Sequence, residues 1–160
     1  MPKNCKALMI CLAVPLAVGG LSTLLTREGM ERFKAAAKPP LTPPDWLFPV
    51  VWTALFILMG LASYLVWKSG GSRRNVRMAL SIYGAQLAFN FCWSIIFFDL
   101  EMYLFAFFWL VALWGLILAV TVLFHQHSPA AAYLMVPYLL WVAFAGYLNM
   151  GVYLLNDIFS

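Results

Sequence analysis

Residues 38–56 read KPPLTPPDWLFPVVWTALF, a stretch in which a polar, proline-rich segment turns into a continuous apolar run. Thr42, Pro43 and Asp45 form a helix-start pattern, because threonine can cap, proline suits the first helical position and an acid favours the positive end of the dipole. Pro49 falls inside the expected helix, where it removes one hydrogen bond and frees the carbonyl of Asp45. We therefore expect a membrane helix that starts in this stretch and bends near its entry.

The composition of the whole chain predicts a membrane protein. Of its 160 residues, 64% are hydrophobic and 10% are charged, and the mean hydropathy is +0.88, far outside the range of soluble domains. A spanning helix needs about 20 largely apolar residues. The sequence supplies segments that predict a single all-α, five-transmembrane-helix bundle, with helices at about 7–25, 46–67, 78–98, 101–124 and 131–155 and a long loop at 26–45.

Charged residues divide unevenly between the two sides of such a bundle. The side of the N-terminus carries cations alone: Lys3, Lys6, Lys68, Arg73, Arg74 and Arg77. The other side carries the remaining cations and the acids: Arg27, Arg32, Lys34, Lys38, Glu28, Glu31, Asp45, Asp99, Glu101 and Asp157. This bias predicts the N-terminus inside and the C-terminus outside if the protein lies in a bacterial cytoplasmic membrane. Anchoring at the membrane surface accounts for the cations, so we expect no nucleic-acid partner.

Three of the expected helices carry aromatic faces with a few amides. At about 100° per residue, the shared faces contain, in chain order, Trp52 and Phe56; Gln86, Asn90 and Trp93; and Tyr138, Trp141, Ala145 and Asn149. Such faces suit a large, flat, apolar ligand with polar edges, because rings stack on it and amides orient it. The same residues also suit a packed core in which the amides bond across helices. The spacing leaves both interpretations open.

Several kinds of chemistry have little support in the sequence. The segment 78–160 contains no lysine or arginine and few acids, whereas ion-coupled transport normally uses ionisable groups at membrane depth. His125 and His127 lie together in a connection, where solvated histidines are expected, and no serine has a histidine in a plausible helix. We therefore expect no catalytic residues, no metal and no obligatory cofactor.

A row of small residues on the third expected helix favours close helix packing. The residues are Ser81, Gly84, Ala85 and Ala88. Small residues at four-residue spacing let two helix backbones approach closely in a membrane. The row predicts a tight contact, either within the bundle or between the two chains of a homodimer.

The order of these motifs resembles the translocator protein / tryptophan-rich sensory protein (TspO) family, also called the peripheral-type benzodiazepine receptor family. The resemblance covers roughly residues 26–156 and rests on KPPLTPPDWLFPVVWTALF, YGAQLAFNFCW and SPAAAYLMVPYLLWVAFAGYLN. It implies a five-helix bundle, commonly homodimeric, with an interior cavity beneath the long first loop. The implied ligands are porphyrins, haem-like tetrapyrroles, sterols in some members and benzodiazepine-type compounds.

The family's motifs assign site residues to this chain. Matching positions are Trp52 in the V-W motif, Asn90 in A-Q-L-A-x-N, Tyr138 and Trp141 in P-Y-L-x-W, Ala145 at a small position that shapes the cavity, and Asn149 in L-N. Phe56, Gln86 and Trp93 share their faces and complete the expected ligand site. The expected rim of the cavity consists of Leu41, Pro43, Pro44, Trp46 and Pro49.

Three departures from the family pattern bear on function. Leu41 stands where most members have tryptophan, which affects how the loop closes over a ligand. Met150 stands where porphyrin-degrading members have a second tryptophan, and no basic residue follows Tyr153 to complete the sterol motif. The resemblance therefore implies a receptor or transporter for porphyrin-like tetrapyrroles, acting in sensing, transport or removal. The alternatives are a light-dependent porphyrin-degrading enzyme and a structural or assembly subunit without a ligand.

Overall fold

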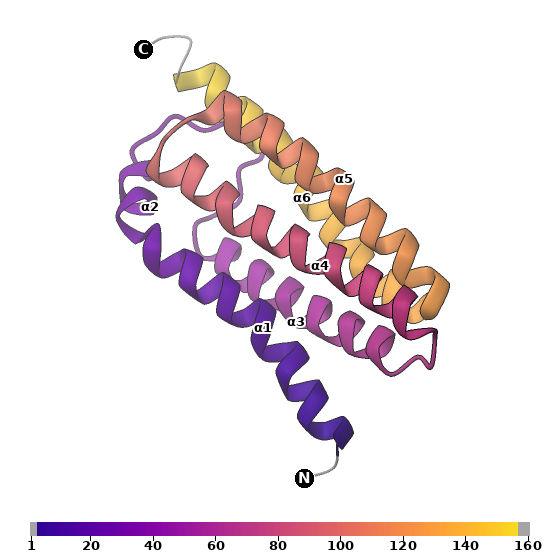
Figure 1. Cartoon of the computed structure of the whole chain (residues 1–160). Helices are drawn as coiled ribbons and strands as arrows, with labels where there is room; N and C mark the ends of the chain where they lie inside the picture. Colours follow the sequence, from indigo (N-terminus) through magenta and orange to yellow (C-terminus); the bar gives the residue numbers. More distant parts are fainter. Residues whose placement is uncertain (1–2, 157–160) are drawn as a thin grey trace.

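A computed structural model describes residues 3–156, which form a bundle of helices (Figure 1). The elements are α1 (Lys3–Leu25), α2 (Arg27–Phe33), α3 (Leu47–Trp67), α4 (Arg73–Ser94), the π-helical turn η1 (Ile95–Asp99), α5 (Tyr103–His127) and α6 (Pro129–Asn156). Five helical segments are long and apolar enough to cross a membrane, which confirms the predicted all-helical, five-span architecture. The predicted side of Asp157 concerns a residue outside the described part of the chain.

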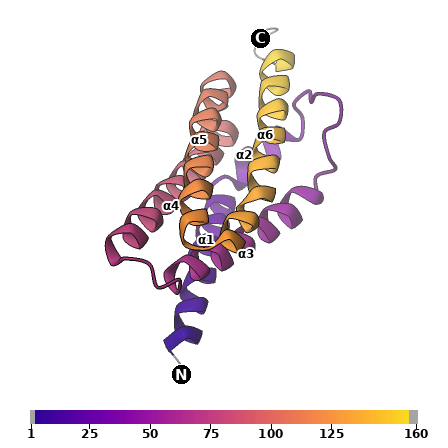
Figure 2. The ribbon, with the colours of Figure 1, turned by 90° about the vertical axis from the view of Figure 1, so that its right-hand side faces the viewer.

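The two ends of the bundle carry different connections. The start of α1, the α3–α4 connection and the α5–α6 connection lie at one end (Figure 1). The short helix α2, the α4–α5 turn and the C-terminal end of α6 lie at the other. Figure 2 shows α5 and α6 side by side, with the loop between α2 and α3 extending beside α6. The bundle therefore has one end with short connections and one end covered by the long segment 26–46.

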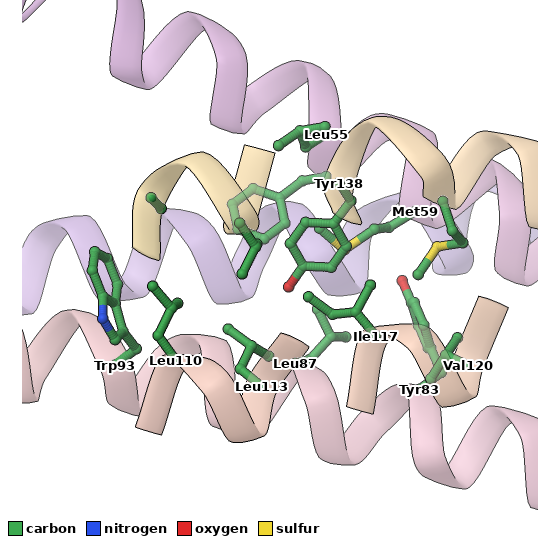
Figure 3. Packing of buried hydrophobic residues seen from close by; sticks show 14 of the residues in the cluster. Leu55, Met59, Tyr83, Leu87, Trp93, Leu110, Leu113, Ile117, Val120 and Tyr138 are labelled. Carbon is green, nitrogen blue, oxygen red and sulfur yellow. The ribbon is translucent and has the colours of Figure 1, made fainter. Parts of the chain in front are cut away.

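The interior of the bundle is packed with apolar side chains from α3, α4, α5 and α6. Helix α1 supplies fewer buried residues. Met59 of α3, Leu87 of α4 and Ile117 of α5 are buried around Tyr138 of α6 (Figure 3). Large apolar side chains such as Phe108 and Leu140 remain exposed on the outer faces. An apolar outer surface is what a bundle surrounded by lipid requires.

The start of α3 differs from the predicted capping pattern. The helix begins at Leu47, its cap residue Trp46 makes no side-chain capping bond, and the hydroxyl of Thr42 donates to the carbonyl of Pro39 at 2.6 Å instead. The physical reason is the proline pair, since a residue before proline is kept out of the helical region. Because Pro43 itself precedes Pro44, it does not take the first helical position, and the helix begins at Leu47, one residue from the start predicted at 46.

Pro49 does not interrupt α3, so the bend predicted there is wrong. It is the third residue of the helix, and the first four backbone N–H groups of any helix have no intrahelical acceptor. A proline in this turn therefore removes no hydrogen bond. The structure places Pro15 inside α1 and Pro137 inside α6, where each proline does remove one.

The segment 26–45, predicted to be a loop, contains the short helix α2. Its Gly29 lies so close to the turn after α4 that an added Cβ would come within 2.5 Å of the carbonyl oxygen of Phe98. Phe33 packs edge-on against Phe97 at 5.2 Å between ring centroids, and Arg32 Nε donates to Glu101 at 3.1 Å. These contacts come from residues about 70 positions away, so the helix depends on the tertiary structure.

The last turn of the predicted helix 78–98 is wider than an α-helix. η1 spans Ile95–Asp99, and such π-helical turns are rare and occur frequently at functional sites. Here the turn places Phe97 next to Trp93 with 5.0 Å between ring centroids. The same turn presents the backbone against which α2 packs.

Candidate functional site

Four aromatic side chains from α3 and α6 form one cluster near the middle of the bundle. Trp52 stacks on Phe56 at 5.7 Å between ring centroids. Its indole also meets Tyr138 edge-on at 6.2 Å and Trp141 at 6.5 Å. The structure therefore brings together the predicted faces of α3 and α6, with Trp52 as the ring that contacts all the others.

A buried chain of hydrogen bonds joins this cluster to α4. Asn90 Nδ2 donates to the hydroxyl of Tyr138 at 2.6 Å, and that hydroxyl donates to Gln86 Oε1 at 2.7 Å. Gln86 Nε2 lies 3.8 Å from the sulfur of Met59. Gln86 and Tyr138 are fully buried and Asn90 is 5% exposed, so the three polar groups satisfy one another away from water.

A second polar contact lies further along the same helices, toward η1. Trp93 Nε1 donates to Asn149 Oδ1 at 3.0 Å, and Asn149 Nδ2 donates to the carbonyl of Tyr103 at 2.8 Å. This contact ties α4, α5 and α6 together. Ala145, which is 9% exposed, lies between Trp141 and Asn149 on the inner face of α6.

The indole nitrogen of Trp141 is a hydrogen-bond donor that the protein does not use. It is buried and has no partner among residues 3–156. By contrast, Trp93, Trp109 and Trp114 all donate to oxygen atoms of the protein. A buried polar group without a partner is costly in an apolar environment, and such a group is a candidate contact for a ligand.

Every predicted ligand-site residue lies on an inner face of its helix, where the rings and amides of the site contact one another. Phe56 lies behind Trp52 and against Gly19 of α1, where an added Cβ would overlap the Phe56 ring. The two grooves that the structure describes lie elsewhere. One of about 470 Å³ runs between α5 and α6 and includes Met150, and one of about 500 Å³ lies where α3 meets α4.

The predicted rim residues lie mostly on the surface. Leu41 is 81% exposed and has a left-handed φ of 70°, Trp46 is 66% exposed, and Pro44 and Pro49 are also exposed, whereas Pro43 is partly buried. The loop contacts α6 through residues earlier in the chain. The carbonyl of Pro40 accepts from the Tyr147 hydroxyl at 2.7 Å, and Asn156 bonds both backbone groups of Ala37.

The row of small residues on α4 is not used for packing inside the bundle. Ser81, Gly84, Ala85 and Ala88 are all exposed, and an added Cβ on Gly84 would meet no atom within 4 Å. Glycines of other helices make the close contacts, since Gly60 of α3 lies against the backbone of Cys11 and Leu12. The α4 row thus faces outward from the single chain.

Three residues of the site were not predicted from the sequence. Phe48 and Phe144 lie on either side of Trp141 at 5.8 and 5.7 Å between centroids, and Met59 meets Gln86. A signal for Phe48 was present, because it precedes Trp52 by the same four residues by which Phe56 follows it. Among residues 3–156, no three His, Cys, Asp or Glu side chains are placed to hold a metal ion.

Comparison with known proteins identifies relatives over almost the whole chain. Residues 11–155 match the TspO/MBR family. The chain is 38% identical over 157 residues to the tryptophan-rich protein TspO of Chlorobaculum tepidum, covering 98% of this chain and 99% of that protein. It is 37% identical over 147 residues to the translocator protein of Bos taurus, covering 91% and 87%. It is 40% identical over 127 residues to that of Homo sapiens, covering 79% and 75%.

Proposed function

Because this chain belongs to the TspO/MBR family, we propose that it is an integral membrane receptor or transporter-type protein that binds porphyrins and related tetrapyrroles between α3, α4 and α6. The observation that carries the proposal is the buried, unpartnered N–H of Trp141 beside the aromatic cluster around Trp52. If these residues only packed against one another, a buried N–H without an acceptor at membrane depth would cost free energy without any benefit.

The chemistry of the cluster suits a porphyrin such as protoporphyrin IX, which is flat, aromatic and carries carboxylates at one edge. Trp52 and Phe56 offer rings for stacking, and offset or edge-on ring contacts contribute about 0.5–1.5 kcal/mol each beyond the buried area. The Trp141 N–H would donate to a carboxylate, since bonds to charged acceptors are the stronger ones. Asn90 and Gln86 would give up their hydrogen bonds to Tyr138 and form hydrogen bonds to the ligand.

A ligand between α3 and α6 would have to separate rings that contact one another, and a bend of α6 would do this. Pro137 precedes Tyr138 and leaves the carbonyl of Tyr133 without its usual intrahelical donor. A helix bends most easily where such a hydrogen bond is missing. Tyr147 and Asn156 tie the segment 37–40 to the far end of α6, so a bend at Pro137 would carry this part of the loop with it.

The exposed row on α4 supports a homodimer as part of the proposal. Ser81, Gly84, Ala85 and Ala88 form an outward face on which a second backbone can approach closely. A Gly84→Leu substitution would block that approach without touching the bundle, because an added Cβ at Gly84 meets open space. We expect light scattering in detergent to report a monomer for this variant and a dimer for the unchanged protein. A dimer in both would remove this face from the proposal.

The distribution of charge supports an orientation with the N-terminus inside. The cations of the α3–α4 connection and of the N-terminal segment have no acidic neighbours in sequence. Short loops rich in lysine and arginine stay on the cytoplasmic side. Labelling of a cysteine introduced at Ser72, at the start of α4, by an impermeant maleimide tests this. Protection in intact cells supports the orientation and labelling contradicts it.

A porphyrin titration tests the binding proposal. Protoporphyrin IX is added in the dark to purified protein, and the shift of its absorbance band is followed for the unchanged chain, Trp52→Ala and Asn90→Leu. We expect saturable binding that weakens about tenfold in each variant, because a ring or an amide contact is lost. Trp109→Phe is the matched control, since Trp109 stacks on Phe89 outside the site. Unchanged affinity in both site variants would refute the site.

An illuminated arm of the same titration separates binding from degradation. Met150 stands where degrading relatives are expected to have tryptophan, and it lines the outer groove between α5 and α6. We expect the porphyrin band to persist under light. Its rapid loss would favour the enzyme alternative, and the absence of any saturable binding would favour a structural subunit.

A further inference from the structure

A groove of about 500 Å³ lies at the end of the bundle where α3 connects to α4, away from the aromatic site. Its lining consists of Trp67, Gly70 and Gly71 from the end of α3 and the connection, and Arg73, Val76, Arg77, Leu80 and Ser81 from α4. These α4 positions recur every three or four residues, so they form one face of the helix. The groove therefore runs along α4 from its first turn toward membrane depth.

The mouth of the groove is positively charged and has no acidic partner. Arg73 and Arg77 are four residues apart on the lining face and are exposed. All acidic residues within 3–156 lie at the opposite end of the bundle. The ion pairs described there, Arg32 with Glu101 and Lys34 with Glu31, are at that opposite end too. Two guanidinium groups at one mouth thus remain available for an external anion.

The deeper part of the groove is apolar. Trp67 is 38% exposed and Val76 and Leu80 are partly buried beside it. Tryptophan is typical of the membrane–water interface, where its ring lies at headgroup level. Ser81 adds no open polar group, because its hydroxyl donates to the carbonyl of Arg77 at 2.7 Å. The groove is therefore charged at the membrane surface and apolar toward the interior, as an amphiphilic ligand requires.

The connection that forms the wall of the groove is held in place by the two glycines. Gly70 adopts a φ of +80°, which glycine tolerates without strain. Gly71 lies against His127 at the end of α5, since an added Cβ would come 2.6 Å from its Nδ1. The wall is thus packed against another helix.

We propose that this groove binds an anionic phospholipid. Arg73 and Arg77 hold the phosphate, because guanidinium groups bind phosphate oxygens through paired, charge-assisted hydrogen bonds. One acyl chain runs along Trp67 and Leu80. Attraction of anionic lipids to basic segments at the membrane surface adds to the binding. A free phosphate would use the two arginines alone and leave the apolar wall uncovered.

Short-chain lipids test the proposal on the full-length protein in detergent micelles. Dioctanoyl phosphatidylglycerol, dioctanoyl phosphatidylcholine and inorganic phosphate are titrated separately by calorimetry. We expect saturable phosphatidylglycerol binding at least tenfold tighter than that of either other probe. The double variant Arg73→Gln, Arg77→Gln should weaken it at least tenfold, which is about 1.4 kcal/mol. The double variant Lys68→Gln, Arg74→Gln is the matched control, because it removes the same two positive charges from this end of the bundle but neither residue lines the groove.

Three outcomes would overturn the proposal. Equal losses in the control double variant and in Arg73→Gln, Arg77→Gln would mean that only the net charge of this end attracts the lipid. Equal binding of phosphatidylcholine would exclude recognition of the anionic headgroup. Equal binding of inorganic phosphate would mean that the apolar wall contributes nothing. Melting curves establish that each variant is folded before its binding is compared.

Discussion

The two sides of α3 pack against their neighbours in different ways. Toward α1 the contact is made by glycines: Gly60 meets the backbone of Cys11 and Leu12, and Gly19 meets the ring of Phe56. Toward α6 the contact is made by rings, with Trp52 against Tyr138 and Trp141. The first contact brings backbones together and leaves no space, whereas the second holds them apart with large side chains.

The difference indicates that the contact between α3 and α1 is fixed, whereas side chains in the contact between α3 and α6 can change partners. The close α1–α3 contact involves backbone atoms, and such contacts leave a side chain nowhere to move. The α3–α6 contact contains rings, amides in a bonded chain, and the unused donor of Trp141. A ligand can replace side-chain contacts of this second kind without separating the backbones of the first.

The largest expected effect comes from breaking the glycine contact. In Gly60→Leu, the new Cβ would lie 2.7 Å from the carbonyl oxygen of Cys11 and 2.9 Å from the Cα of Leu12. We expect the free energy of unfolding to fall by about 3 kcal/mol, because backbone atoms must shift to make room. Thermal melting in detergent measures the loss. A melting temperature equal to that of the unchanged protein would show that α1 is free to move away.

A smaller effect is expected when the hydroxyl of Tyr138 is removed from the contact between α3 and α6. Tyr138→Phe deprives Asn90 of its acceptor and Gln86 of its donor, and we expect a loss of about 1–2 kcal/mol in the free energy of unfolding. Tyr147→Phe is the matched control, since it also loses one hydroxyl but from an exposed bond to Pro40. Equal melting temperatures for the two variants would contradict the role given to the buried chain.

The smallest effect is expected at a glycine that makes no close contact. An added Cβ on Gly20 meets nothing within 4 Å, although its neighbour Gly19 lies against Phe56. Gly20→Ala should therefore raise the free energy of unfolding by about 0.5–1 kcal/mol, because alanine favours the helix. Gly19→Ala should lower both the melting temperature and porphyrin affinity by displacing the ring behind Trp52. Equal melting temperatures and equal porphyrin affinities in the two variants would contradict the claim that Gly19 makes a close contact and Gly20 does not.

Much of this arrangement could be predicted from local patterns in the sequence. Apolar runs long enough to span a bilayer predicted the five helices, and the 100° rotation per residue placed Trp52, Asn90 and Tyr138 on inner faces. Helix α2 and the turn η1 escaped prediction because they are held by contacts between distant residues, such as Gly29 with Phe98. Local patterns do not contain that information.

The start of α3 shows how two local rules compete. Thr42 and Asp45 have the spacing of a capping box, but the two prolines disfavour the helical region at Thr42 and Pro43. The helix begins at Leu47, after a turn in which the Leu47 N–H donates to the carbonyl of Pro44. Because the helix starts at Leu47, Pro49 lies in its first turn, where it removes no hydrogen bond. Likewise, the helical spacing placed Gln86 and Asn90 on a site face, but it did not identify Tyr138 as the residue that bonds to both.

The most direct test of the central claim compares two tryptophan variants in a dark protoporphyrin IX titration. Trp141→Phe removes the unused N–H, whereas Trp114→Phe removes an N–H that donates to the carbonyl of Leu139 at 3.0 Å. We predict that porphyrin affinity falls about tenfold in Trp141→Phe, the value of one hydrogen bond to a charged group, and stays within twofold in Trp114→Phe. Equal affinities in the two variants would contradict the assignment of the ligand site to α3, α4 and α6.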